Sequence, residues 1–340
     1  MSGTSKKTPV IQVKEVKRYY RQRSSSLFGK KARIQAVDGV SFSVHEGEIF
    51  GIIGESGCGK STLGRLLTCL EKPSSGEILF QGRETSHMDK RQSKAFHRSV
   101  QSVFQNPFDT FTPNDTIGQI MLRPLRLHKI GRDDEERRRM CLSALEESGL
   151  TPAEDFWERF PHELSGGQLQ RISILRSMLL EPAFVIADEP VSMLDVSVRA
   201  EIIHLFQTLC RKKKTAILFI SHDIAVVRYI SDRVAVMYLG RIVEMGDADT
   251  VIQNPLHPYT QALISNCASI DPDTDAPVIE IQGEPPSPVN PGPGCYFANR
   301  CFKSCERCFK EYPPMQQMPD GRVVSCFCAA PMKEEQSDEN

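Results

Sequence analysis

Nine consecutive residues, GESGCGKST at positions 54–62, combine glycines, a lysine and hydroxyl side chains at a spacing that suits phosphate binding. They fit the pattern G-x-x-x-x-G-K-[ST], in which glycines let successive backbone N–H groups turn toward phosphate oxygens. A helix beginning at Lys60 would add the favourable partial charge of its N-terminus. We expect Lys60 to reach the β- and γ-phosphates and Ser61 to ligate Mg²⁺. The predicted nucleotide-binding residues are Gly54, Glu55, Ser56, Gly57, Cys58, Gly59, Lys60, Ser61 and Thr62.

Two acidic residues, Asp188 and Glu189, directly follow the apolar run FVIA. Asp188 is expected to bind the Mg²⁺ through water, as the acidic partner of the phosphate-binding loop. Glu189 lies at the carboxyl end of the predicted strand, where it can accept a proton from an attacking water as a general base. Together with the loop, these acids predict the hydrolysis of a nucleoside triphosphate.

Predicted strands and helices alternate around these segments. A strand candidate at residues 10–16 is followed by residues 37–54, which end in a continuous apolar run typical of a strand buried on both faces. Two more buried runs, 184–187 and 215–221, are separated by a helical pattern, so the order favours an α/β fold with a parallel sheet. Residues 97–177 are predicted to be mostly helical.

The pentapeptide LSGGQ, at residues 164–168, opens another predicted helix before the acidic pair. A helix N-terminus presents N–H and hydroxyl donors to an anion. In this position the pentapeptide resembles the signature motif of the ATP-binding-cassette (ABC) ATPases, a family with a phosphate-loop α/β core and an inserted helical subdomain. In that family the motif binds the γ-phosphate of ATP held by the opposite subunit. The resemblance implies this role for Ser165, Gly166, Gly167 and Gln168.

Further segments resemble the family's other motifs, in the family's order. Gln105, in VFQNP, resembles the glutamine that touches Mg²⁺ and water and senses the membrane subunits. Asp195 resembles the D-loop aspartate, although the family usually has alanine where a methionine stands two residues earlier. His222 resembles the switch histidine that contacts the γ-phosphate. Tyr19 resembles the aromatic residue that stacks on adenine, with Tyr20 as the alternative.

The resemblance covers almost the whole chain and narrows to the oligopeptide/dipeptide-importer branch, in particular to the second of its two ATPases. The phrase NPLHPYTQALI at residues 254–264 and the cysteine tail after PSPVNPGPGC carry this resemblance. It implies ATP and Mg²⁺ as cofactors. It also implies a second, usually different ATPase subunit, two integral membrane permease subunits and, indirectly, an extracytoplasmic solute-binding protein. The leading hypothesis is an ATPase that powers peptide import, with nickel or another small solute as the alternative cargo.

Composition agrees with a peripheral subunit at the cytoplasmic face of a membrane. Apolar residues make up 40% and charged residues 25% of the chain, and the net charge of -1 gives no overall attraction to nucleic acid. No apolar run approaches the ~20 residues of a membrane-spanning helix, and the start of the chain does not resemble a secretory signal. A soluble ABC protein of DNA repair or translation would typically show a coiled-coil insertion or two fused cassettes, and neither appears.

We expect residues 1–255 to form the nucleotide-binding domain, with the helical subdomain at about 97–177. A change in composition then leads into a small cysteine-rich extension at residues 256–332, followed by an acidic tail at 333–340.

Six of the eleven cysteines crowd into residues 295–328 of this extension. An odd total and the nucleotide-binding motifs argue for a reducing compartment, where such a cluster indicates a metal site before disulfides. Thiolates suit iron–sulfur chemistry, and the branch carries four cysteines that resemble ligands of a [4Fe–4S] cluster. These are Cys295, Cys301, Cys308 and Cys326. Cys305 and Cys328 are alternatives to a neighbouring ligand, and zinc or no metal at all are the competing interpretations.

Overall fold

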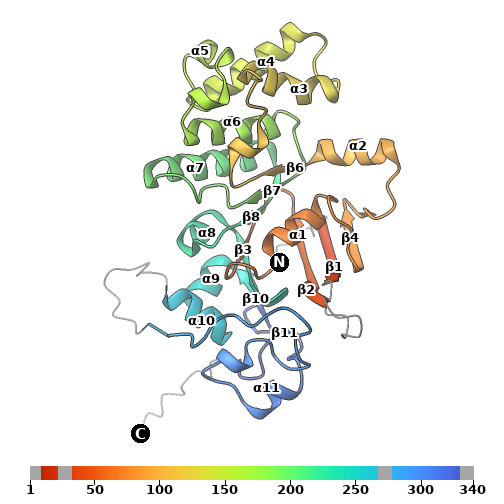
Figure 1. The fold of residues 1–340 in the computed structure, drawn as a ribbon, viewed down its shortest axis with the longest axis vertical. Helices are drawn as coiled ribbons and strands as arrows, with labels where there is room; N and C mark the ends of the chain where they lie inside the picture. Colours follow the sequence, from red (N-terminus) through yellow and green to blue (C-terminus); the bar gives the residue numbers. More distant parts are fainter. Residues whose placement is uncertain (1–8, 22–32, 267–277, 330–340) are drawn as a thin grey trace, which may run out of the picture.

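The computed structural model describes residues 9–21, 33–266 and 278–329 (Figure 1). Within these residues the larger sheet has the strand order β11-β12-β10-β9-β3-β8-β7-β6. Its strands are β3 (Ile49–Ile53), β6 (Val100–Val103), β7 (Phe184–Asp188), β8 (Ala216–Ile220), β9 (Arg233–Tyr238), β10 (Arg241–Asp247), β11 (Gln316–Gln317) and β12 (Val323–Val324). A smaller antiparallel sheet has the order β2-β1-β4-β5. Its strands are β1 (Pro9–Arg21), β2 (Arg33–His45), β4 (Ser75–Phe80) and β5 (Arg83–Glu84).

The centre of the larger sheet is parallel, which confirms the predicted α/β fold. β3 pairs with β8 and β9, and β7 pairs with β6 and β8, all in the parallel sense. β3 and β8 are buried along their whole length, which is why their sequences are continuous apolar runs. Because parallel strands point the same way, their carboxyl ends lie together at one edge of the sheet.

Helices flank the sheets and form a separate group at one end of the molecule (Figure 1). The α-helices are α1 (Lys60–Leu67), α2 (Lys90–Ser99), α3 (Ile117–Leu127), α4 (Asp134–Glu147), α5 (Ala153–Trp157), α6 (Gly166–Met178), α7 (Val196–Lys213), α8 (Ile224–Ile230), α9 (Ala248–Gln253), α10 (Pro258–Ser265) and α11 (Glu306–Lys310). Three-residue and four-residue 3₁₀ turns are η1 (Pro107–Thr110), η2 (Pro161–Glu163) and η3 (Ala298–Arg300).

The group of α3, α4, α5 and α6 has a hydrophobic core of its own, as expected for an inserted helical subdomain. Gly118 in α3 lets the Trp157 indole approach so closely that a Cβ atom there would lie 2.4 Å from the ring. The main sheet reaches into the start of the segment expected to be mostly helical. Residues 100–103 form β6, whose Val100 and Val103 are buried against the main sheet. The short strand directly follows a helix, so its own pattern was too brief to separate it from the helical region.

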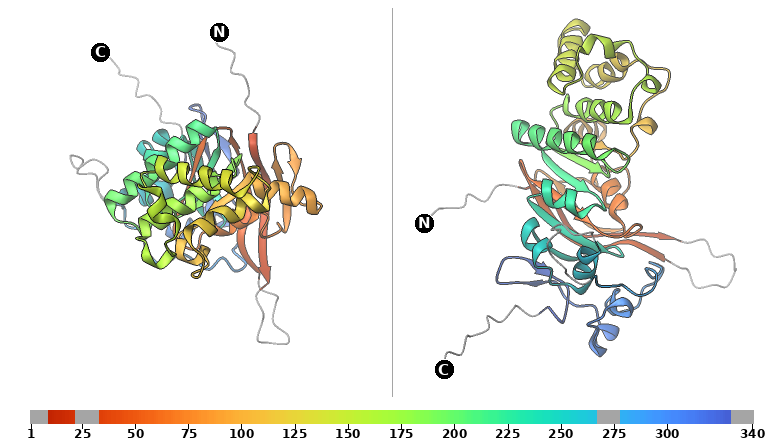
Figure 2. Two further views of the ribbon diagram at one scale, coloured as in Figure 1. Left: turned by 90° about the horizontal axis from the view of Figure 1, so that it is seen from above. Right: turned by 90° about the vertical axis from the view of Figure 1, so that its left-hand side faces the viewer.

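The C-terminal extension lies at the opposite end of the long axis from the helical subdomain, as Figure 1 and the right-hand view of Figure 2 show. It is joined to the main sheet, because β12 pairs antiparallel with β10 and β11 with β12. The predicted acidic tail lies outside the described residues. No helix of the described segments is long and apolar enough to cross a bilayer.

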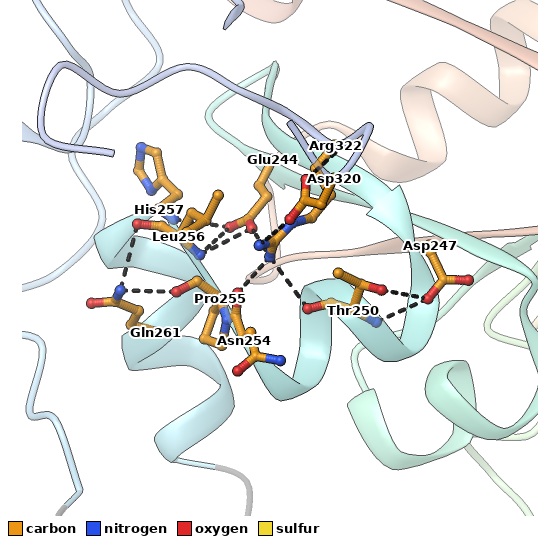
Figure 3. Close-up of polar contacts among 10 residues, drawn as sticks. All are labelled: Glu244, Asp247, Thr250, Asn254, Pro255, Leu256, His257, Gln261, Asp320 and Arg322. Carbon is orange, nitrogen blue, oxygen red and sulfur yellow. Dashed lines mark hydrogen bonds and ion pairs between the residues drawn. The ribbon is translucent and has the colours of Figure 1, made fainter. Parts of the chain in front are cut away.

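A buried ion pair fastens this extension to the segment before α10 (Figure 3). Arg322 Nη1 lies 3.3 Å from Glu244 Oε1 and also donates to the Thr250 carbonyl at 3.2 Å. The Glu244 carboxylate accepts the N–H groups of Leu256 at 3.0 Å and His257 at 2.9 Å. A buried charge is stable only when it is paired in this way. The network therefore fixes where α10 begins.

Candidate functional site

The phosphate-binding loop leaves the buried strand β3 and enters α1 at Lys60, as the sequence predicts. Gly59 immediately precedes the helix with φ +105°, and a Cβ atom there would lie 2.0 Å from the Ala36 carbonyl oxygen. Gly57 also has a positive φ of +77°, but it faces open space. The glycine at position 59 is thus needed both for its backbone conformation and for the close approach of β2.

Lys60 is 6% exposed, and its ammonium group is held inside the loop. Lys60 Nζ donates to the carbonyl oxygens of Gly54 at 2.7 Å and Glu55 at 3.0 Å. The Cys58 thiol lies beside it and is buried, which raises the pKa of that thiol. The loop therefore holds one cation close to the N-terminus of α1, an arrangement that attracts phosphate.

Asp188, the last residue of β7, has the surroundings of a cation ligand. Its Oδ1 atom is shielded from solvent and has no hydrogen-bond partner within the described residues. Burial raises the pKa of the carboxyl group, while a hydrogen bond from Ser61 and the charge of Lys60 oppose that shift. An unpaired buried carboxylate oxygen is costly, so the site fits Mg²⁺, which takes few protein ligands and keeps water and phosphate oxygens.

Glu189 and His222 meet at the same edge of the sheet. The Nδ1 atom of His222 lies 3.1 Å from Glu189 Oε2. The Glu189 backbone is in the left-handed region at φ +49°, and its N–H donates to the Ile220 carbonyl at 2.9 Å. Such a conformation is costly outside glycine and is concentrated at functional sites. The arrangement can place a carboxylate base and an imidazole on the same water or phosphate group.

The signature segment lies in the helical subdomain, whereas α1 lies beside the smaller sheet (Figure 1). Ser165 is the exposed N-cap of α6, and its hydroxyl accepts the Gln168 N–H at 3.3 Å. Gly167 allows α7 to pack closely, because a Cβ atom there would lie 2.4 Å from Val198. Asp195 is the exposed N-cap of α7. In Figure 1, α6, which begins after Ser165, and α1, which begins at Lys60, lie apart in this chain.

The other predicted contacts lie around the loop without joining it. Gln105 is exposed in the segment between β6 and η1, and no hydrogen bond connects its side chain to Asp188 or Ser61 in the described part of the chain. Tyr19 and Tyr20 point to opposite faces of β1. The Tyr19 hydroxyl donates to Asp38 at 2.5 Å, and the Tyr20 hydroxyl donates to Glu71 at 2.6 Å.

Two residues of the C-terminal third reach the phosphate-binding loop, and the sequence reasoning missed them. The Tyr259 hydroxyl accepts the N–H of Glu55 at 2.9 Å. Arg300 Nη1 lies 3.1 Å from the Glu55 carboxylate. Tyr259 belongs to the phrase HPYT, which by its sequence indicates only the branch of the family and no contact with the loop. The one available signal was a tyrosine within a predicted helix: if such a side chain is buried, its hydroxyl needs a hydrogen-bond partner.

The cysteines of the extension gather at one place. Burial, with smaller contributions from Cys308, Cys301 and Cys326, raises the pKa of the Cys295 thiol to about 12. Cys305 Sγ lies 3.5 Å from Cys308 Sγ. Across residues 9–21, 33–266 and 278–329, no three His, Cys, Asp or Glu side chains are placed to hold one metal ion.

A glycine-rich loop between a buried parallel strand and a helix, with two acids at the end of another parallel strand of the same sheet, defines a phosphate-loop nucleoside triphosphatase. The family model described as ABC transporter matches residues 37–192. A second model, oligopeptide/dipeptide transporter, C-terminal region, matches residues 243–308. The chain therefore belongs to the ABC transporter ATPases, in the group that carries this C-terminal region.

Named relatives agree with this assignment. The chain is 42% identical over 323 residues to the putative oligopeptide transport ATP-binding protein YkfD of Bacillus subtilis, covering 94% of this chain and 96% of that protein. It is 43% identical over 319 residues to the dipeptide transport ATP-binding protein DppF of Escherichia coli, covering 94% of each. Among solved structures, the ADP- and phosphate-bound dimer of the cassette MJ0796 matches with a TM-score of 0.61 at 28% identity, over 70% of this chain and 98% of that one.

Proposed function

We propose that this chain hydrolyses ATP to power the import of di- and oligopeptides through membrane permease subunits. The observation that carries the motor role is the unpaired Asp188 oxygen beside Ser61, one residue before the Glu189–His222 pair. Peptide cargo is supported by the relatives at 42% and 43% identity, which are named oligopeptide and dipeptide transport proteins. The chain would work as a peripheral subunit at the cytoplasmic face of the membrane.

We assign the predicted contacts as follows. Lys60 and the loop N–H groups bind the β- and γ-phosphates, and Ser61, Asp188 and Gln105 surround Mg²⁺. The ion, when bound, supplies charge neutralisation for the developing negative charge. Glu189 accepts the proton of the attacking water, and His222 holds the γ-phosphate. Tyr19 stacks on adenine, with Tyr20 as the alternative; the hydroxyl of each is hydrogen-bonded, to Asp38 and Glu71 respectively.

We propose that each ATP is bound between two ATPase subunits. The separation of α6, whose N-cap is Ser165, from α1, which begins at Lys60, supports this arrangement, as does the dimeric state of the similar cassette MJ0796. The partner is expected to be a paralogue that supplies its own signature motif. Asp195, exposed before α7, would then face that partner.

A cavity next to the loop of Gln105 is our candidate contact with the permeases. It has a volume of about 330 Å³ and is lined by apolar side chains such as Phe111 and Leu127 together with Arg123 and Arg176. Burial lowers the pKa of Arg176, and the charge of Arg123 lowers it further. A permease segment with an apolar face and a carboxylate would complement this cavity. Whether the permease holds cargo would then influence the Mg²⁺ site through Gln105, which lies in the adjacent loop.

The peptide-import proposal is tested by uptake in cells that carry the full set of transporter subunits. Cells with the intact chain should accumulate a labelled dipeptide and tripeptide, while Lys60→Ala should remove uptake and leave the assembled complex intact. Co-purification of two hydrophobic permease subunits with both forms is the control for assembly. Uptake of nickel but of neither peptide would contradict the peptide assignment and favour the alternative cargo.

We further propose that the extension holds a [4Fe–4S] cluster on Cys295, Cys301, Cys308 and Cys326. What supports it is an all-thiolate donor set, whose members Cys308, Cys301 and Cys326 lie near enough to Cys295 to influence its thiol. Such a cluster would be structural. Cys305 and Cys328, both exposed, remain alternatives to a neighbouring ligand.

Anaerobic purification of the full chain should give a brown protein with about four irons per chain. Cys308→Ser should remove the colour, because a buried thiolate ligand is lost. Cys210→Ser, a buried cysteine outside the extension, is the matched control and should leave the spectrum unchanged. A colourless protein with one zinc per chain, or with no metal, would contradict the cluster.

A further inference from the structure

The Glu55 residue of the phosphate-binding loop is held from two sides by the C-terminal third of the chain. Its backbone N–H donates to the Tyr259 hydroxyl, 204 positions away, at 2.9 Å. Its carboxylate pairs with Arg300, 245 positions away, at 3.1 Å. The backbone carbonyl oxygen of Glu55 accepts a hydrogen bond from Lys60 Nζ at 3.0 Å. A displacement of Glu55 would therefore move the lysine that meets the phosphates.

Tyr259 is held rigidly. It is fully buried, and its ring lies 4.6 Å from that of Tyr238 and 5.3 Å from that of Phe297, measured between ring centroids. Its N–H donates to Nδ1 of His257 at 3.0 Å. Figure 3 shows how Glu244 fixes the segment just before this helix through the N–H groups of Leu256 and His257. The hydroxyl of Tyr259 thus reaches the loop from a fixed support.

Arg300 is held in a comparable way by the extension. Its side chain is 9% exposed, and its guanidinium contacts both oxygens of Glu55, at 3.1 and 3.3 Å, and the Tyr238 hydroxyl at 3.3 Å. It ends η3 and directly precedes Cys301. A guanidinium that contacts both oxygens of a carboxylate makes a strong and directional interaction. Without it, the loop would present an uncompensated negative charge next to the triphosphate.

We propose that Arg300 and Tyr259 are positioning residues for ATP: they hold Glu55, and through it Lys60, in the conformation that receives the phosphates. This inference rests on the proposed motor function. The C-terminal region then contributes to the nucleotide site itself, beyond any role in assembly or metal binding. Arg300 neutralises the Glu55 carboxylate so that the loop stays attractive to a polyanion, and Tyr259 fixes the direction of the first peptide group after Gly54.

The test uses the full chain and Mg²⁺–ATP, with affinity measured by equilibrium titration and turnover measured in the assembled transporter. Arg300→Met should weaken ATP binding about tenfold, since a charge-assisted contact is lost and Glu55 is left unpaired. Tyr259→Phe should weaken it about fivefold through the loss of one hydroxyl. In both variants KM should rise more than kcat falls. The matched controls, Arg307→Met and Tyr312→Phe in the same extension, should bind ATP as the wild type does.

A double substitution separates positioning from a general loss of structure. Glu55→Gln removes the unpaired charge, so Arg300→Met with Glu55→Gln should recover most of the affinity lost in Arg300→Met alone. Arg300→Lys should retain part of it. Wild-type affinity in both Arg300→Met and Tyr259→Phe would overturn the inference, as would a loss that Glu55→Gln does not relieve. A wild-type chain that does not bind ATP would instead contradict the proposed motor function.

Discussion

Glu189→Gln should lower ATP turnover of the assembled transporter by roughly 10²- to 10⁴-fold, the contribution of a general base, while ATP and Mg²⁺ still bind. Glutamine keeps the size and polarity of the side chain and can still meet His222, 3.1 Å away in the wild type. It cannot accept the proton of the attacking water. The variant should therefore hold ATP between the two subunits without hydrolysing it.

Single-turnover and steady-state phosphate release measure this effect, and gel filtration with ATP detects the trapped dimer. Glu181→Gln is the matched control, because Glu181 also has a left-handed backbone, at φ +50°, but pairs with Lys213 away from the site. It should turn over ATP as the wild type does. Activity from an intact second site is subtracted by placing the equivalent change in the partner subunit. Normal turnover in the doubly substituted complex would refute the role of Glu189.

Ser165→Arg should abolish hydrolysis at the ATP site that this chain completes for its partner, while this chain's own affinity for ATP stays unchanged. In the proposed two-subunit site, the exposed start of α6 receives the γ-phosphate of ATP bound to the other subunit, and an arginine side chain would occupy that position. The negative charge of the transition state would then no longer be stabilised by the hydroxyl and N–H donors at the start of α6, which the proposed site acquires only when the two subunits close. By the same reasoning, the chain alone at high dilution should hydrolyse ATP poorly.

Ser165→Arg removes a helix cap as well as blocking the phosphate position, and the two effects must be distinguished. Thr116→Arg supplies the control, since Thr116 and Gln119 form the same capping arrangement at α3 in the same subdomain. Each substitution should cost about 1 kcal/mol of stability through the lost cap, and only Ser165→Arg should remove hydrolysis. ATP binding is measured on the isolated chain and turnover on the complex. If the dilute isolated chain hydrolyses ATP as fast as the complex, the two-subunit site is refuted.

The parts of this site that are local in sequence were predictable. A glycine-rich loop between an apolar run and a helical pattern fixes the position of Lys60, and the two acids after FVIA fix Asp188 at the end of its strand. Packing across long distances was not predictable. Nothing near Glu55 indicates that a tyrosine 204 positions later accepts its N–H. Alternation along a strand separates Tyr19 from Tyr20, but only the paired residues, Asp38 and Glu71, show which face each occupies.

The proposed role of Tyr259 and Arg300, which both contact Glu55, implies that nucleotide binding and the order of the extension are thermodynamically linked. Linkage is reciprocal: if an ordered extension strengthens ATP binding by some factor, bound ATP stabilises the ordered extension by the same factor. Loss of the extension's order would then lower the affinity for ATP without any change in the phosphate-binding residues. Bound ATP, in turn, would protect η3 and the cysteines next to it from local unfolding. ATP thereby acts as a stabilising ligand for the extension, although the extension contains none of the predicted ATP-binding residues.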